Sequence, residues 1–337
     1  MIDLLEDRST LEENALYVLC VFVVNNPSVA VIDIGSNTIK LLVAARDESG
    51  RLTERASKTI DARISAGISQ KPPRLSEAGI VTGIAAIRDL LAVAAPLAPT
   101  QTMLVATSAV RDAANGAEFC ARVRTATGHD LRILTGDEEA NLIGTGLLCD
   151  SALAGLHDFY VFDLGGGSLE CLAFRARRIA QETSLPLGCV RLTEKFVSDP
   201  AAPFPAEANT AIVAHVKHTL AGSRFQFTLA GAAAIFAGGS VTTVRAIFAA
   251  HHGKNLRDIS PVVTVPELHA LLNRVAPLSL AERKKISGLP PSRADVFPTA
   301  LATILTVAEM AGLKEFQHSF YNLRWGLAAE ALRLGKD

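Results

Sequence analysis

The sequence predicts an α/β protein made of two similar halves that face each other across a cleft. Short β-rich runs alternate with helical stretches along most of the chain. A strand, Asp-x-Gly turn, strand unit at Asp33 recurs about 130 residues later at Asp163. The 337 residues are 49% hydrophobic and 20% charged, which provides enough apolar material for two cores.

The first half begins with a predicted three-stranded meander at residues 29–34, 39–44 and 51–59, with a tight turn at 35–37. Ser76 is typical of a helix N-cap. The apolar residues of the helix after it recur on one face: Ile80, Ile84, Ile87 and Leu91. The other elements expected here are a strand at 103–106, a helix at 117–127, a strand at 131–134 and a helix from about 137 to 148.

The second half repeats this order of predicted strands and helices. Strands are predicted at 160–163, 169–174 and 179–187, with a glycine-rich turn between the first two, and helices at 206–220 and from about 242. A C-terminal helix at 324–334 is expected to return to the first half. The predicted domains are therefore an N-terminal extension at 1–27, domain I at 28–147, rejoined by 322–337, and domain II at 148–321.

Charge and cysteine content restrict the partners and the compartment. Lys+Arg 33 against Asp+Glu 34 gives a net charge of −1, so bulk charge predicts no nucleic-acid partner and any anion needs a local site. Five widely spaced cysteines without a C-x-x-C pair indicate reduced thiols in a cytoplasmic protein. They are Cys20, Cys120, Cys149, Cys171 and Cys189.

The N-terminal extension carries an apolar run at residues 15–24, preceded by acidic residues. Ten residues are too few to span a bilayer, which takes about 20, and a signal peptide would begin with positive charge. We therefore expect no membrane anchor. The segment is predicted to cover a hydrophobic surface, either on its own domain or at the contact of a homodimer.

The first Asp-x-Gly turn has the composition of an anion site. Gly35 lets backbone N–H groups approach an anion, and Ser36, Asn37 and Thr38 add side-chain donors. Asp33 can hold a divalent cation. Taken alone, the motif is also compatible with an ordinary β-turn rich in turn formers.

The second turn is more specific. Asp163 and Glu170 bracket a turn that contains four small residues: Gly165, Gly166, Gly167 and Ser168. Three consecutive glycines would weaken a buried strand pair, so close approach of the backbone to a ligand is the expected reason for them. The flanking acids suit a phosphate with a metal ion.

Two such hairpins, one at the start of each half, resemble the phosphate-1 and phosphate-2 pattern of the actin-like ATPase and sugar-kinase superfamily (ASKHA, ribonuclease H-like). Four further motifs accompany them in order: ATSAVRDAAN at 106–115, GDEEA at 136–140, SLPLGCVRLTE at 184–194 and AGGS at 237–240. From about residue 29 to 334 the chain resembles the exopolyphosphatase / guanosine pentaphosphate phosphohydrolase (Ppx/GppA) family. It departs from that pattern at Ser240, where Thr is usual, and at Thr299, where Gly is common.

The resemblance implies two actin-like domains and four catalytic residues. Arg111 matches the arginine that clamps the phosphoryl group, and its guanidinium suits bidentate binding. Glu139 matches the general base for the attacking water, and its pKa should be raised because it lies beside another acid. Asp163 and Glu170 match acids near a divalent metal, with Asp33 as a further ligand.

Other positions carry over as substrate-binding residues. Lys40 matches a basic position that faces the substrate oxyanions. Gly238, Gly239 and Ser240 match a third turn, which borders the nucleotide or the distal phosphates.

The implied reaction is hydrolysis of the terminal phosphoanhydride bonds of inorganic polyphosphate, with Mg²⁺ or Mn²⁺ as the cofactor. Longer members of the family carry a C-terminal HD-type helical domain for which there is no room after Trp325, so short chains are the expected substrates. Two alternatives stay open. One is removal of the 5′-phosphate of the guanosine nucleotide pppGpp, and the other is a non-hydrolytic polyphosphate or nucleotide binder of actin-like fold.

Overall fold

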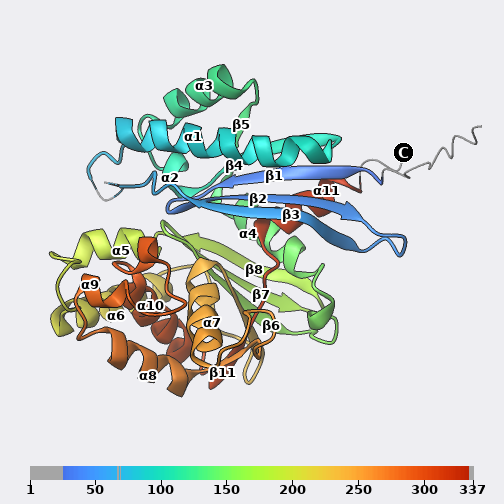
Figure 1. The fold of residues 1–337 in the computed structure, drawn as a ribbon. Coiled ribbons are helices and arrows are strands. Elements are labelled where there is room, and N and C mark those ends of the chain that lie inside the picture. The colour runs from blue at the N-terminus through green and yellow to red at the C-terminus, as the bar shows by residue number, and fades with distance from the viewer. Residues whose placement is uncertain (1–25, 67, 69, 334–337) are drawn as a thin grey trace, which may run out of the picture.

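The computed structural model describes residues 26–333, except residues 67 and 69. Residues 1–25 of the predicted extension, including the apolar run at 15–24, lie outside the described residues. Two sheets, each covered by helices, stand one above the other in Figure 1.

The first sheet has five strands in the order β3-β2-β1-β4-β5. The apolar runs predicted for a meander form its antiparallel part, and β1 continues the sheet as the parallel neighbour of β4. The strands are β1 (Ser28–Ile34), β2 (Thr38–Arg46), β3 (Leu52–Asp61), β4 (Gln101–Ala106) and β5 (Leu131–Ile133).

Helices α1 and α3 cover one face of this sheet (Figure 1). The predicted cap is confirmed, because the Ser76 hydroxyl accepts a hydrogen bond from the Gly79 amide at 3.0 Å. The stretch Glu77–Leu97 is long and apolar enough to cross a membrane, but core helices pass the same test, and here Ile80, Ile87 and Leu90 are buried in the core. The helical elements are α1 (Glu77–Ala94), η1 (Ala95–Leu97), α2 (Ser108–Arg111) and α3 (Gly116–Thr127).

The second sheet repeats the strand order of the first. Read from its edge it runs β8-β7-β6-β9-β11, again with an antiparallel meander followed by parallel neighbours, and β10 is added beyond β11. The internal repeat predicted from the sequence is thus confirmed. The strands are β6 (Phe159–Leu164), β7 (Leu169–Arg175), β8 (Arg178–Leu185), β9 (Ala233–Ala237), β10 (Val262–Thr264) and β11 (Glu315–His318).

Several helices of the second half were not predicted. All but two residues of the longest of these are buried, so its sequence lacks the polar face that marks an amphipathic helix. The helical elements are η2 (Ser151–Leu153), α5 (Cys189–Phe196), α6 (Ala206–Ala221), α7 (Gly239–His251), α8 (Val265–Val275), α9 (Leu280–Arg283), η3 (Pro291–Arg293) and α10 (Phe297–Met310).

Helices α4 (Gly136–Leu147) and α11 (Leu323–Ala331) pack against each other between the sheets (Figure 1). Two glycines allow the close approach: a side chain at Gly146 would overlap the Asn322 carbonyl, and one at Gly326 would overlap that of Leu142. Helix α11 also packs on β1 and β2, as expected for a C-terminal helix that returns to the first half.

Candidate active site

The two hairpins place equivalent residues at equivalent sheet positions. Asp33 of β1 is the cross-strand partner of Lys40 in β2, and Asp163 of β6 is the partner of Glu170 in β7. The first strand of each hairpin thus has an aspartate one residue before its end. The residue opposite this aspartate in the second strand is a lysine in the first half and a glutamate in the second half.

The turns themselves are closed by the same backbone hydrogen bond. The Gly35 amide donates to the Thr38 carbonyl at 3.1 Å, and the Gly165 amide donates to the Ser168 carbonyl at 3.0 Å. The repeated Asp-x-Gly pattern therefore corresponds to one local structure that occurs twice.

Between the turns lies a cavity of about 70 Å³. Most of the residues predicted for the site line it: Asp33, Gly35, Ser36, Asn37, Thr38, Lys40, Glu139, Asp163, Gly165, Gly166, Ser168, Glu170, Gly238 and Gly239. The cavity is far smaller than the roughly 300–1,000 Å³ of common ligand pockets, so in this conformation it holds only a small group or the end of a chain.

Three predicted residues do not line the cavity. Arg111 reaches it only through its contact with Glu139. Gly167 packs against the opposite turn. Ser240 is buried beside the Cys189 thiol, to which its side chain hydrogen-bonds. Gly167 and Ser240 thus make packing contacts here, and the substrate-binding role expected for them stays a prediction.

Several lining residues escaped the sequence reasoning. A side chain at Gly239 would overlap the guanidinium of Arg293, which therefore lies against the third turn. Arg293 is the last residue of the short η3, and no spacing rule marks it. The unpredicted lining residues are Thr107, Ser108, Ile143, Leu164, Arg293, Asn322 and Leu323.

Asn37 is the clearest sign that the cavity is built for a polar ligand. Its side chain is 4% exposed, and neither its amide nitrogen nor its oxygen has a hydrogen-bond partner within the protein. Buried polar groups are normally satisfied, because an unmet donor or acceptor is costly. The Asn37 amide is thus available to a ligand in the cavity.

The glycines at 166 and 167 also have a packing role that the sequence did not indicate. An ideal Cβ at Gly166 would lie 2.8 Å from the Ser36 Cβ, and one at Gly167 would lie 2.7 Å from the Ser36 hydroxyl and would overlap that of Ser108. The second turn needs small residues because it packs directly on the first turn and on α2. Contact with a ligand is not required to explain them.

Arg111 and Glu139 are paired at the edge of the cavity. Nη1 of Arg111 donates to Oε2 of Glu139 at 2.8 Å and to the carbonyl of Leu134 at 3.0 Å. The Arg111 side chain is 22% exposed and that of Glu139 is 8% exposed. The two residues that the sequence marked as clamp and base are therefore direct neighbours.

Burial raises the pKa of Glu139 well above its usual value, and the nearby Glu170 raises it further, while Arg111 opposes both effects. The expected raised pKa is confirmed, but the neighbouring acid is not Glu138. That residue is exposed and caps α4, since its carboxylate accepts from the Thr135 amide at 2.8 Å.

Glu170 is the second acid with a strongly shifted pKa. Burial first, and Asp163 second, raise its pKa to about 7, against hydrogen bonds from Ser168 and Ser184. The Ser184 hydroxyl donates to Oε1 of Glu170 at 2.7 Å. Glu139 and Glu170 are thus two buried carboxyls of one site, and the charge of Glu170 raises the pKa of Glu139.

The floor of the cavity carries opposite charges. Burial raises the pKa of Asp33 and raises that of Asp163 to about 6, and Lys40 and Arg324 oppose both shifts. The pKa of Lys40 is lowered, first by burial and then by Arg324. These charges are out of water, so each depends on its neighbours for neutralisation.

A preformed metal cage is not present among residues 26–66, 68 and 70–333: no three His, Cys, Asp or Glu side chains converge there. Mg²⁺, however, is commonly held by one or two carboxylates together with substrate phosphates and waters. Asp33 and Asp163 both line the cavity, and Asp33 raises the pKa of Asp163. A cation nearby would stabilise the ionised form of both carboxyls. The donor set fits that substrate-bridged mode, and Glu170 fits it less well because Ser184 already holds its carboxylate.

The fold and the paired turns define a two-domain α/β protein with a phosphoryl-sized polar cavity between two Asp-x-Gly hairpins. The chain belongs to the Ppx/GppA phosphatase family, whose family model matches residues 42–334.

Solved structures share the fold. An exopolyphosphatase from Cytophaga hutchinsonii has a TM-score of 0.81 at 20% identity and covers 91% of this chain and 98% of its own. An exopolyphosphatase-like protein has a TM-score of 0.83 at 24% identity, with 92% and 99% covered. The fold class predicted from the sequence is confirmed.

Curated relatives include the guanosine-5′-triphosphate,3′-diphosphate pyrophosphatases of Aeromonas salmonicida and Aliivibrio fischeri. Each is 28% identical, over 305 and 304 residues respectively, and the match covers 90% of this chain. The chain spans about three fifths (59%) of the length of these relatives.

Proposed function

We propose that this protein hydrolyses the terminal phosphoanhydride bond of linear inorganic polyphosphate. The observation that carries the proposal is the buried Glu139, with its raised pKa, facing a phosphoryl-sized cavity beside Arg111. Family membership supports phosphatase chemistry. The cavity size supports action at chain ends, because a longer stretch of polyphosphate has no room in it.

Each group then has a task that its position allows. The carboxylate of Glu139 accepts a proton from a water molecule as the water oxygen attacks the terminal phosphorus. The bond from that phosphorus to the bridging oxygen breaks, and the shortened chain leaves with the bridging oxygen and its electron pair. Arg111 and the side chain of Asn37 supply donors to the phosphoryl oxygens, where charge neutralisation and positioning provide most of the acceleration.

Mg²⁺ or Mn²⁺ is proposed as the cofactor, with Asp33 and Asp163 as its protein ligands and Glu170 nearby. When bound, such an ion would neutralise negative charge on the substrate phosphates. Lys40 and Arg324 oppose the charges of Asp33 and Asp163, and Lys40, which lines the cavity, contributes to binding the substrate anion.

Removal of the 5′-phosphate of pppGpp is the second candidate. The observation that favours it is the 28% identity to relatives named as guanosine-5′-triphosphate,3′-diphosphate pyrophosphatases. The same acid, arginine and turns would serve both substrates. The homodimer and the cytoplasmic location expected from the sequence stay predictions.

A phosphate-release assay tests these candidates. Polyphosphates of graded length, pppGpp and ATP are compared, each with Mg²⁺ and with EDTA. We expect phosphate release from polyphosphate, with the highest kcat/KM on short chains, and loss of release in EDTA. Release from pppGpp alone would favour the second candidate, and release from none of the substrates would contradict both.

A further inference from the structure

Helix α5 holds the carbonyl groups of the second glycine turn. Backbone amides at the start of α5 donate to the carbonyls of Gly165 and Gly166 at 2.9 to 3.2 Å. The side chain of Arg191 completes the set, because its Nε donates to the Gly167 carbonyl at 2.8 Å. The orientation of all three peptide groups is thereby fixed from one side.

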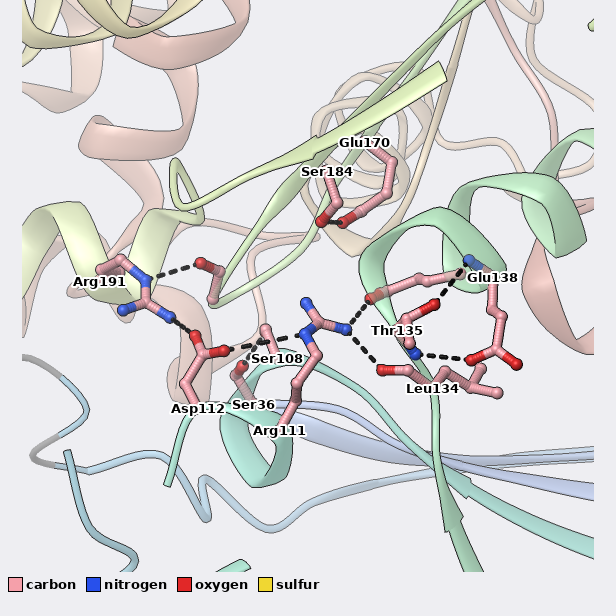
Figure 2. Close-up of polar contacts among 12 residues, drawn as sticks. Ser36, Ser108, Arg111, Asp112, Leu134, Thr135, Glu138, Glu170, Ser184 and Arg191 are labelled. Carbon is pink, nitrogen blue, oxygen red and sulfur yellow. Dashed lines mark hydrogen bonds and ion pairs between the residues drawn. The ribbon is translucent and has the colours of Figure 1, made fainter. Parts of the chain in front are cut away.

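The other end of the same guanidinium reaches the first half of the chain. Nη2 of Arg191 forms an ion pair with Oδ2 of Asp112, the residue that follows α2. Oδ1 of Asp112 lies 3.7 Å from Nε of Arg111. Figure 2 shows Asp112 between the two arginines, with one carboxylate oxygen directed to each.

Arg111 is consequently held on two sides. Glu139 and the Leu134 carbonyl bind Nη1, and Asp112 lies by Nε. The planar fork of an arginine has few free orientations once both ends are bound, which matters for bidentate contact with a phosphoryl group.

The exposure of the Arg191–Asp112 ion pair indicates that it positions other groups more than it stabilises the fold. The side chains of Arg191 and Asp112 are 16% and 33% exposed. Ion pairs so accessible to water contribute little to stability. They can still select one geometry, and a misplacement of about 1 Å at a reacting group costs roughly 10²-fold in rate.

We propose that Arg191 and Asp112 are positioning residues for the reaction: Arg191 links the second glycine turn to Asp112, which orients Arg111 toward the phosphoryl group. The inference rests on the proposed function of Arg111. It adds that Arg111, which belongs to the first half, is oriented toward the phosphoryl group only when the two halves have the arrangement seen here. The reason is that Arg191 belongs to the second half.

Arg224 offers a matched control. Like Arg191 it donates through Nε to a backbone carbonyl, that of Glu182 at 3.0 Å, and through Nη2 to an aspartate, Asp137. It also joins the second half to α4. It makes no contact with Arg111, and its side chain is 60% exposed.

The test measures turnover of a defined short polyphosphate by R191A, D112N, their double variant, R191K and R224A. We expect R191A and D112N each to lower kcat by about 10- to 100-fold, with a smaller change in KM. The double variant should lose no more than the worse single variant, since both act through Arg111. R191K should recover only part of the loss, because one ammonium cannot serve both Gly167 and Asp112. R224A should match the wild type.

A second measurement does not need turnover. In an E139Q background, calorimetric binding of tripolyphosphate is compared for R111A, R191A and D112N. We expect R111A to weaken binding most, and the other two to weaken it by about 3- to 10-fold.

The outcomes separate the two ideas. If R111A weakens binding but R191A and D112N do not, or if their kcat losses simply multiply, the positioning role is wrong while the proposed function stands. A fall in kcat that follows the melting temperature would also overturn it in favour of a structural role. If tripolyphosphate does not bind, both proposals fail together.

Discussion

Arg111 and Glu139 form an ion pair, with 2.8 Å between Nη1 and Oε2, at the edge of the cavity between the two turns. The proposed clamp and the proposed base are thus partners in the free protein. Arg111 lowers the pKa of Glu139 against the effects of burial and Glu170. We expect a phosphoryl group that draws the guanidinium away to leave Glu139 a stronger base.

Substitution of Arg111 should impair turnover. The kcat/KM for polyphosphate should fall by about 10²-fold or more, because a guanidinium contact to the phosphoryl group is lost in both the ground and the transition state. Arg111→Lys should be rescued only in part, since the planar fork is lost. Steady-state kinetics of both variants check this, and an unchanged kcat/KM in both would remove Arg111 from the mechanism.

The pH dependence follows from the direction of the Glu139 shift. A base must be ionised, so kcat/KM should fall as the pH drops through the raised pKa, well above the ordinary glutamate value of 4.5. Glu170→Gln removes the like charge that raises this pKa, and should move the acid limb to lower pH. An acid limb at or below pH 4.5 in the wild type, or one that moves up in the variant, would contradict the pairing of the two acids.

The stability of the protein should depend on pH through Glu170. Burial raises the pKa of Glu170 to about 7 from 4.5, so its ionisation in the folded protein is unfavourable, and stability is lost as the pH rises through about 7. Glu170→Gln should raise the melting temperature relative to wild type at pH 8, by the equivalent of about 1–3 kcal/mol, and the difference should shrink at pH 5. Thermal melts at both pH values decide this, and a variant that is equally destabilised at both would contradict it.

The packing of the second glycine turn against Ser36 and Ser108 leads to a further prediction. Gly167→Ala should lower both stability and activity, because the methyl group would strike the hydroxyls of Ser36 and Ser108. Ser108→Ala in the same chain should restore part of the stability. Gly155→Ala is the control, since a side chain there meets nothing within 4 Å. A Gly167→Ala variant with wild-type melting temperature would show that the turns do not need this contact.

The local patterns predicted the repeated part of the fold well. The meanders, the Ser76 cap and the lining residues of the two turns follow from strand periodicity, turn composition and a pattern that occurs twice, whereas Lys40, Glu139, Gly238 and Gly239 were predicted from the family resemblance. Helix α10 was not predicted from the sequence, because its sides are nearly all buried and no amphipathic pattern remains.

Contacts between residues far apart in the chain were also not predictable from the sequence. No spacing rule places Arg293 against Gly239, or Arg191 beside Asp112, since their partners are far away in the chain. The composition of the turn at 166 and 167 indicates close approach, but only the structure shows that Ser36 is one of the approaching groups. Burial, and not the adjacent Glu138, raises the pKa of Glu139.

The most direct test compares two neighbouring acids. Glu139→Gln keeps the shape of the buried side chain but removes the proton acceptor, whereas Glu138→Gln alters the cap of α4 and an ion pair with Arg132, both outside the cavity. In a phosphate-release assay on short polyphosphate, Glu139→Gln should lower kcat by about 10²- to 10⁴-fold with little change in tripolyphosphate binding, and Glu138→Gln should stay within a few fold of wild type. Retention of more than roughly a third of the wild-type kcat by Glu139→Gln would show that this carboxylate is not the base.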